Sequence, residues 1–163
     1  MIETPATVDP GRTLTRRLGD EGATTRLGAA LAALARPGDA LLLSGPYGAG
    51  KTALARAFLR AATGDAALVV PSPSFTLVQT YALPGGTTAW HYDLWRAEGE
   101  SDLAELGWDE ARAGIVLVEW PERLGTQAPE DALSITLSPV AGEAGARDAT
   151  LSGWPGRLER LAA

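Results

Sequence analysis

Residues 41–52 read Leu-Leu-Leu-Ser-Gly-Pro-Tyr-Gly-Ala-Gly-Lys-Thr, an apolar run followed directly by a glycine-rich turn that ends in Lys-Thr. Residues 45–52 fit the pattern G-x-x-x-x-G-K-[S/T]. In this pattern glycines let main-chain N–H groups converge on phosphate oxygens, and the following helix adds the positive end of its dipole. Lys51 would give a point charge to the β- and γ-phosphates, and Thr52 a hydroxyl to Mg²⁺. The stretch therefore predicts a nucleotide-binding strand, loop and helix.

The basic residue of this loop is unusual for the chain. Among 14 lysine and arginine residues, Lys51 is the only lysine. An arginine side chain carries a planar, bulky fork and does not reproduce the compact charge of an ammonium. In a sequence biased toward arginine, the retained lysine favours a phosphate-binding role. A glycine-rich turn with an incidental lysine is the alternative, and the strand and helix patterns around the loop argue against it.

The rest of the chain alternates between apolar runs and helical patterns. Residues 40–44, 68–70 and 115–118 are typical of strands buried on both faces, and residues 75–81 and 87–93 indicate a hairpin turning at 84–86. We also expect helices over 20–35, 51–62 and 100–113, a polar strand at 12–18, a late hairpin from 132–137 and 149–152, and a short helix after Pro155. This order predicts the α/β class, in a three-layer P-loop NTPase-like fold whose mainly parallel central sheet has antiparallel edge hairpins.

Length, charge and composition limit the function classes. The 163 residues predict a single P-loop ATPase domain over 1–163, with the Pro/Thr-rich residues 1–11 expected to be flexible. A net charge of −6 argues against direct binding to a nucleic-acid backbone. Cysteine is absent, so no disulfide or thiol chemistry is expected, and no apolar run is long enough to cross a membrane. We therefore expect a cytoplasmic protein with no membrane partner.

Two carboxylates are candidates to complete the site. Glu119 ends the apolar run 115–118, where a parallel strand would deliver it to the ligand-binding edge of the sheet as a Mg²⁺ ligand. Asp93 ends the strand 87–93 and would hold a metal-bound water or orient the attacking one. The alternatives are that Glu119 is a solvated residue at a strand end and that Asp93 is a helix cap or turn residue. His91 is interpreted as a structural hydrogen bonder.

Residues 72–76, Ser-Pro-Ser-Phe-Thr, place three hydroxyls on a proline-stiffened loop after an expected strand. Such a loop can sense a γ-phosphate, although the same composition also suits an ordinary loop. Trp90, Trp95, Trp108 and Trp120 are interpreted as core or partner surface rather than as an adenine stack.

The ordered set of motifs resembles the bacterial TsaE (YjeE) family, small ATPases of tRNA threonylcarbamoyladenosine biosynthesis. The resemblance covers about residues 12–138 and rests on 24–28, 37–39, 43–52, 72–78 (Ser-Pro-Ser-Phe-Thr-Leu-Val), 91–96 (His-Tyr-Asp-Leu-Trp-Arg), 105–107 and 118–122 (Val-Glu-Trp-Pro-Glu). Departures are small: Ser74 stands where the family usually has threonine, Pro46-Tyr47 where it has Asp-Leu, and Trp95 where it has tyrosine.

The resemblance implies ATP and Mg²⁺ as cofactors and ATP hydrolysis that is weak alone and stimulated by partners. The partners would be a TsaD–TsaB complex that modifies adenosine 37 of certain tRNAs, so that tRNA is met only through the complex. Lys51, Asp93 and Glu119 are the expected catalytic residues, and Thr52 and Glu119 the expected metal ligands. The expected nucleotide contacts are Gly45, Tyr47, Gly48, Ala49, Gly50, Lys51, Thr52, Ala53 and Ser74.

Other classes of protein share part of this pattern. A GTPase is disfavoured because guanine recognition normally uses an N/T-K-x-D motif, and the only lysine lies in the loop. A small-molecule kinase would show the same loop and metal chemistry, although Arg96, Arg112 and Arg123 are too scattered to indicate a lid. A third alternative is a nucleotide-gated binding module, in which ATP orders residues 72–80 and hydrolysis is incidental.

Overall fold

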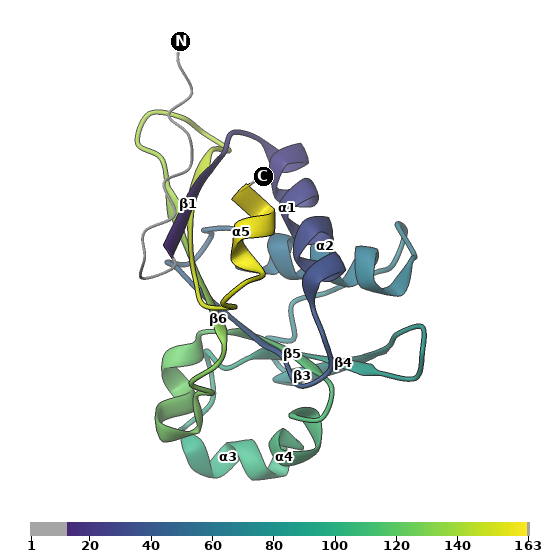
Figure 1. Ribbon diagram of the computed structural model, residues 1–163. Helices are drawn as coiled ribbons and strands as arrows, with labels where there is room; N and C mark the ends of the chain where they lie inside the picture. The colour runs from purple at the N-terminus through teal and green to yellow at the C-terminus, as the bar shows by residue number, and fades with distance from the viewer. Residues whose placement is uncertain (1–12, 163) are drawn as a thin grey trace.

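The computed structural model describes residues 13–162, so the expected flexibility of residues 1–11 lies outside the described residues. Its seven strands form one sheet in the order β1-β7-β6-β2-β5-β4-β3 (Figure 1). The strands are β1 (Thr13–Leu18), β2 (Ala40–Ser44), β3 (Val78–Ala82), β4 (Thr88–Asp93), β5 (Ile115–Glu119), β6 (Leu133–Pro139) and β7 (Arg147–Ser152). The helices are α1 (Glu21–Leu34), α2 (Lys51–Thr63), α3 (Glu100–Glu105), α4 (Trp108–Ala111), the 3₁₀ helix η1 (Pro121–Gln127) and α5 (Leu158–Ala162).

The sheet is parallel in its centre and antiparallel at its edges. Strands β6, β2, β5 and β4 run parallel to one another, while β3 pairs antiparallel with β4, and β7 pairs antiparallel with both β6 and β1. This arrangement confirms the expected α/β fold with a mainly parallel central sheet and antiparallel edge hairpins. The carboxyl ends of β2, β4 and β5 consequently meet at one edge of the sheet.

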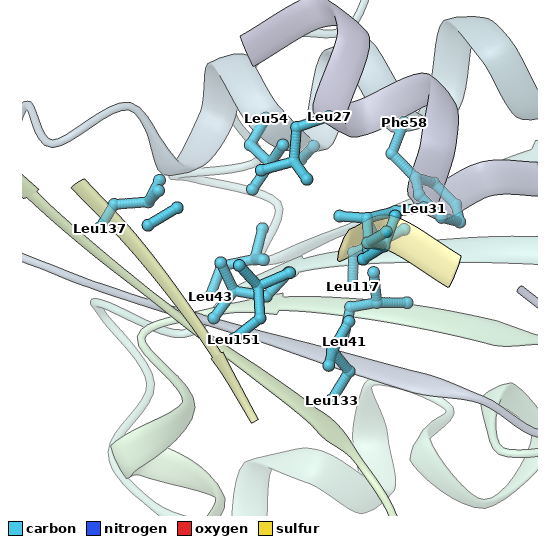
Figure 2. Packing of buried hydrophobic residues seen from close by; sticks show 14 of the residues in the cluster. Leu27, Leu31, Leu41, Leu43, Leu54, Phe58, Leu117, Leu133, Leu137 and Leu151 are labelled. Atoms are coloured by element: carbon cyan, nitrogen blue, oxygen red, sulfur yellow. The ribbon is translucent and has the colours of Figure 1, made fainter. Parts of the chain in front are cut away.

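Helices cover both faces of the sheet, as Figure 1 shows: α1, α2 and α5 on one side, α3 and α4 on the other. Leu41 and Leu43 of β2 pack with Leu117 of β5 in the apolar cluster beneath α1 and α2 (Figure 2). The intervening Leu42, with Val116, packs in a second cluster on the side of α3 and α4. Successive strand residues point to opposite faces of the sheet, and both faces are buried. The central strands are therefore apolar throughout.

Two local features determine where α1 begins and how closely it packs on α2. Asp20 caps α1, because its side chain accepts a hydrogen bond from the N–H of Ala23 at 2.8 Å. Gly28 lies where α1 meets α2, and a Cβ atom there would come within 2.5 Å of the Ala57 Cβ and 2.8 Å of the Phe58 nitrogen. Glycine thus permits a close approach of the two helices.

Three sequence predictions of secondary structure are wrong in part. Residues 68–70 form no strand, because Arg60 Nε donates to the Leu68 carbonyl at 2.9 Å and Arg56 Nη2 to the Val70 carbonyl at 3.1 Å. These carbonyls are therefore bonded to side chains of α2 instead of a neighbouring strand. Val69 between them is 80% exposed, which a central strand would not allow.

The other two differences are breaks at left-handed residues. The helix expected over 100–113 divides into α3 and α4 at Gly107, whose φ of +73° ends the first helix. The strand expected from Phe75 begins only at Val78, because Leu77 has a φ of +66° and its N–H donates to the Pro73 carbonyl at 2.8 Å. The remaining expected elements, including the late hairpin and the short helix after Pro155, are present. Among residues 13–162, no helix has the length and apolar character that a membrane span needs.

Candidate functional site

The glycine-rich motif forms the connection between β2 and α2. Gly45, Gly48 and Gly50 have φ values of +145°, +78° and +102°, a region that other residues rarely adopt. At Gly45 a Cβ atom would also lie 2.5 Å from the Leu137 carbonyl oxygen. Because α2 begins at Lys51, its first N–H groups lack partners within the helix and lie at the loop. The loop therefore offers main-chain donors of the kind that bind anions.

Arg147, the first residue of β7, holds this loop from the far end of the chain. Its Nε donates to the Ala49 carbonyl at 2.7 Å and its Nη2 to the Gly48 carbonyl at 3.2 Å. The C=O and the following N–H of a trans peptide point in opposite directions. The bond to the Ala49 carbonyl consequently turns the Gly50 N–H away from the guanidinium.

The Lys51 side chain is folded back onto the loop. Its Nζ donates to the carbonyls of Gly45 at 2.6 Å and Pro46 at 2.9 Å, and lies 3.9 Å from the centre of the Trp120 ring. Burial lowers the pKa of Lys51, and the nearby carboxylates, with Glu119 the strongest, partly offset that effect. Among residues 13–162 no carboxylate is in hydrogen-bonding contact with this buried cation, which suits it to an incoming anion.

Thr52 and Glu119 are joined by a hydrogen bond. The Thr52 hydroxyl donates to Glu119 Oε1 at 2.7 Å, and His91 Nε2 lies 2.7 Å from the other carboxylate oxygen, Oε2. Glu119 and His91 are 3% and 0% exposed. The predicted metal ligands Thr52 and Glu119 therefore lie together, although they are far apart in the sequence.

Asp93 anchors the hydroxyl-rich loop. Its Oδ2 accepts hydrogen bonds from Ser72 Oγ at 3.0 Å and Ser74 Oγ at 3.5 Å, and its Oδ1 accepts one from the Trp95 N–H at 3.0 Å. The side chain is buried. Asp93 thus connects the end of β4 to residues 72–74 of the loop 72–76, which the sequence indicates as a candidate γ-phosphate sensor.

These groups surround one cleft of about 370 Å³ at the carboxyl ends of the central strands. The cleft is lined by Tyr47, Gly48, Ala49, Gly50, Lys51, Thr52, Ala53, Ser72, Ser74, Asp93, Trp95, Glu119 and Trp120. Every predicted site residue except Gly45 contributes to this wall, and Gly45 touches it indirectly by accepting the hydrogen bond from Lys51. Tyr47 and Trp95 at its mouth are 94% and 52% exposed.

The donor set of the cleft fits a hard cation that keeps several of its own waters. Within residues 13–162, no three His, Asp or Glu side chains converge as a metal-binding group. Mg²⁺ usually takes one or two protein oxygens and completes its shell with water and substrate phosphates. A hydroxyl and a carboxylate in contact, as in Thr52 and Glu119, meet that requirement.

Comparison with known families agrees with this arrangement. The family described as "Threonylcarbamoyl adenosine biosynthesis protein TsaE" matches residues 18–148, which include the phosphate loop, Asp93, Glu119 and Arg147. The chain belongs to the TsaE family. The resemblance stated from the sequence is thereby confirmed.

Relatives of the TsaE family support the assignment over most of the chain. A protein of Bacillus subtilis (strain 168), named tRNA threonylcarbamoyladenosine biosynthesis protein TsaE, is 35% identical over 132 residues, which cover 80% of this chain and 79% of that protein. A relative of the same name from Nostoc sp. is 33% identical over 140 residues, 83% of each chain. A Rickettsia felis relative is 39% identical over 106 residues, 64% of this chain, and the match spans only 61% of that protein.

A solved structure has the same fold as this chain. The crystal structure of Bacillus subtilis YdiB superposes with a TM-score of 0.71 and 29% identity, covering 92% of this chain and 91% of that one. The fold class predicted from the sequence is thus confirmed by a second comparison.

Sequence reasoning about the site missed Ser72, Trp95 and Trp120, which line the TsaE-type cleft, and Arg147, which bonds the phosphate loop from outside it. Arg147 carries no local signal, because it is 98 residues from Ala49, to which it bonds. Trp120 was interpreted as core or partner surface, but it lies beside the Lys51 ammonium and packs on Trp95 with ring centres 4.4 Å apart. Ser72 was noted only as one of three loop hydroxyls.

Proposed function

We propose that this TsaE family member binds ATP with Mg²⁺ in the cleft at the phosphate loop and hydrolyses it in support of tRNA threonylcarbamoyladenosine biosynthesis. The observation that carries the proposal is the contact of Thr52 with Glu119 beside the buried Lys51 ammonium. Phosphoryl transfer requires a cation and a hydroxyl at the start of a helix and a carboxylate beside them. Lys51 and Thr52 begin α2, and Glu119 at the end of β5 contacts Thr52.

Phosphate binding would use the main-chain N–H groups of residues 48–53 and the Lys51 ammonium. In the free protein Lys51 is bonded to carbonyl oxygens of its own loop, so a triphosphate would compete with Gly45 and Pro46 for it. Charge-assisted bonds to phosphate are stronger than bonds to neutral carbonyls, which favours the exchange. Tyr47, Ala49, Ala53 and Ser74 remain proposed as nucleotide contacts because they line the same cleft.

Thr52 and Glu119 are the residues that would hold Mg²⁺. When bound, the ion would neutralise charge that develops on the phosphate oxygens. Asp93 would orient the attacking water, as its buried carboxylate faces the cleft from the strand next to that of Glu119. Two oxygens of Ser72 and Ser74 now contact this carboxylate, so a change at residues 72–74 would alter what Asp93 can accept.

A partner surface around the cleft supports stimulation by other proteins. Tyr47 and Phe75 are 94% and 84% exposed, and Trp95 is half exposed. Tyr47 and Trp95 line the cleft, and Phe75 follows Ser74, which also lines it. Large exposed aromatic side chains are typical of protein interfaces. We propose a TsaD–TsaB-like complex in the cytoplasm as this partner. With a net charge of −6, the chain would meet tRNA through that complex.

Phosphate release from ATP, with and without TsaD–TsaB, tests the proposal. We expect slow release alone, faster release with the partners, and none from Lys51→Ala under either condition. Arg26→Ala provides a matched control, because Arg26 is exposed on α1. Release only after addition of a phosphorylatable small molecule would instead support a kinase, and nucleotide-dependent assembly without release would support a binding module.

A further inference from the structure

His91 is a buried polar residue that the proposed hydrolysis does not use. It is the only histidine of the chain, lies within β4 and is 0% exposed. Its Nε2 is 2.7 Å from Glu119 Oε2, while its Nδ1 has no hydrogen-bond partner among the described residues. A buried nitrogen without a partner is unfavourable for folding.

Packing alone does not account for this side chain. The neighbouring Ala89 in β4 and Leu117, paired with His91 in β5, belong to the apolar cluster beneath α1 and α2. An apolar residue of similar volume would suit that position without an unpartnered nitrogen. The bond to Glu119 is therefore the feature that distinguishes histidine from an apolar side chain here.

The two oxygens of the Glu119 carboxylate have separate partners. Oε1 accepts a hydrogen bond from the Thr52 hydroxyl, and Oε2 accepts one from His91 Nε2–H. Among the described residues, Nε2 is the only nitrogen of this imidazole that has a hydrogen-bond acceptor beside it. A carboxylate fixed at one oxygen presents the other in a constant direction. His91 thus holds Glu119 so that Oε1 stays turned toward Thr52 and the phosphate loop.

We infer that His91 is a positioning residue for the metal site: it orients the Glu119 carboxylate toward a Mg²⁺ ion shared with Thr52. This inference rests on the proposed function, because it assumes that Glu119 serves the metal. Residues that orient a metal ligand typically change metal affinity by about 10–100-fold when they are replaced. His91 acts through Glu119 and makes no contact with the nucleotide.

A pair of amide substitutions separates orientation from packing. In His91→Gln the side-chain NH₂ group reaches about the place of Nε2 and can still donate to Glu119. In His91→Asn the same amide stops near the place of Nδ1 and cannot. Both variants put one amide into the same buried position, but Asn is one methylene shorter, so the unfolding midpoints of both are measured to separate lost packing from lost orientation. Thermal unfolding of both variants verifies that they are folded.

The readout is the Mg²⁺ concentration that half-saturates the complex of the protein with a non-hydrolysable ATP analogue. Tryptophan fluorescence measures this saturation. We expect His91→Asn to raise this concentration about 10–100-fold and His91→Gln to raise it less than about threefold. Affinity for the analogue in EDTA is expected to be unchanged in both. In a Glu119→Ala background, His91→Asn is expected to add no further change, as for two residues that act through one contact.

The sole histidine also allows a test on the unmodified protein. With ¹⁵N-histidine in a chain without an affinity tag, we expect a single Nε2–H signal protected from solvent exchange. That signal is expected to shift when Mg²⁺ and the analogue are added, and to lose its protection in Glu119→Ala. An imidazole protonated at Nδ1 instead of Nε2 would overturn the inference even if a position 91 variant failed to fold.

The outcomes distinguish this inference from the function beneath it. If Glu119→Ala raises the Mg²⁺ requirement and His91→Asn does not, the inference fails and the proposed metal site stands. Equal effects of His91→Asn and His91→Gln would also overturn it in favour of packing. If Mg²⁺ does not strengthen analogue binding in the wild-type protein, the proposed metal site fails, and the inference fails with it.

Discussion

Asp93 and Glu119 occupy paired positions at the carboxyl ends of the parallel strands β4 and β5, yet their carboxylates have different partners. Glu119 accepts hydrogen bonds from Thr52 and His91, and Asp93 accepts them from the segment 72–74 and the Trp95 N–H. One carboxylate is thereby connected to the phosphate loop and the other to the hydroxyl-rich loop. Different roles for two acidic residues in one cleft follow from these contacts.

Glu119→Ala is expected to weaken the Mg²⁺-dependent part of turnover about tenfold or more, because it removes the carboxylate that faces Thr52. Nucleotide affinity in EDTA is expected to change little. Phosphate release measured across a Mg²⁺ titration checks this, with Glu159→Gln, an exposed carboxylate on α5, as the control. Normal turnover with a normal Mg²⁺ requirement in Glu119→Ala would leave Glu119 as a strand-end residue only.

Asp93→Asn is expected to slow phosphate release by about 100-fold or more while leaving nucleotide affinity nearly unchanged. The amide oxygen can still accept the Trp95 N–H bond, so the turn after β4 is preserved, whereas the capacity to take a proton is lost. Single-turnover phosphate release and equilibrium binding separate the two effects. Wild-type release from the variant would show that Asp93 only anchors residues 72–74.

Gly28→Ala is expected to lower the free energy of unfolding by about 1–3 kcal/mol, because the added Cβ would overlap Ala57 where α1 crosses α2. Gly19→Ala, at an exposed position where an added Cβ atom meets nothing within 4 Å, is the control and is expected to leave stability unchanged or slightly raised. Denaturant unfolding of both variants measures the difference. Equal stability of the two would contradict the close helix contact.

The sequence was most informative where structure is local. The strand, loop and helix over 40–63 follow from neighbouring residues: an apolar run, glycines at positive φ and a glycine at the end of α2. The positions of Asp93 and Glu119 followed from the rule that parallel strands end at one edge. These inferences needed no knowledge of contacts between distant segments.

The wrong strand prediction at residues 68–70 and the missed site residues have a common physical origin in side chains from elsewhere in the fold. Residues 68–70 have the composition of a strand, but two arginines of α2 take their carbonyl groups. Arg147 bonds the phosphate loop from β7, and the Trp120 ring reaches Lys51 only because η1 begins beside the cleft. Such pairings depend on tertiary contacts, which single-sequence patterns do not encode.

The central claim is that the Lys51 ammonium binds the phosphates of ATP. Isothermal titration of wild-type protein, Lys51→Ala and the control Arg26→Ala with MgATP tests it most directly, with unfolding midpoints measured alongside. Burial lowers the pKa of Lys51 and so disfavours its charged form in the free fold, and we expect the midpoint of Lys51→Ala not to fall. We predict binding by wild type and Arg26→Ala and none detectable by Lys51→Ala; wild-type affinity in a folded Lys51→Ala protein would contradict the account.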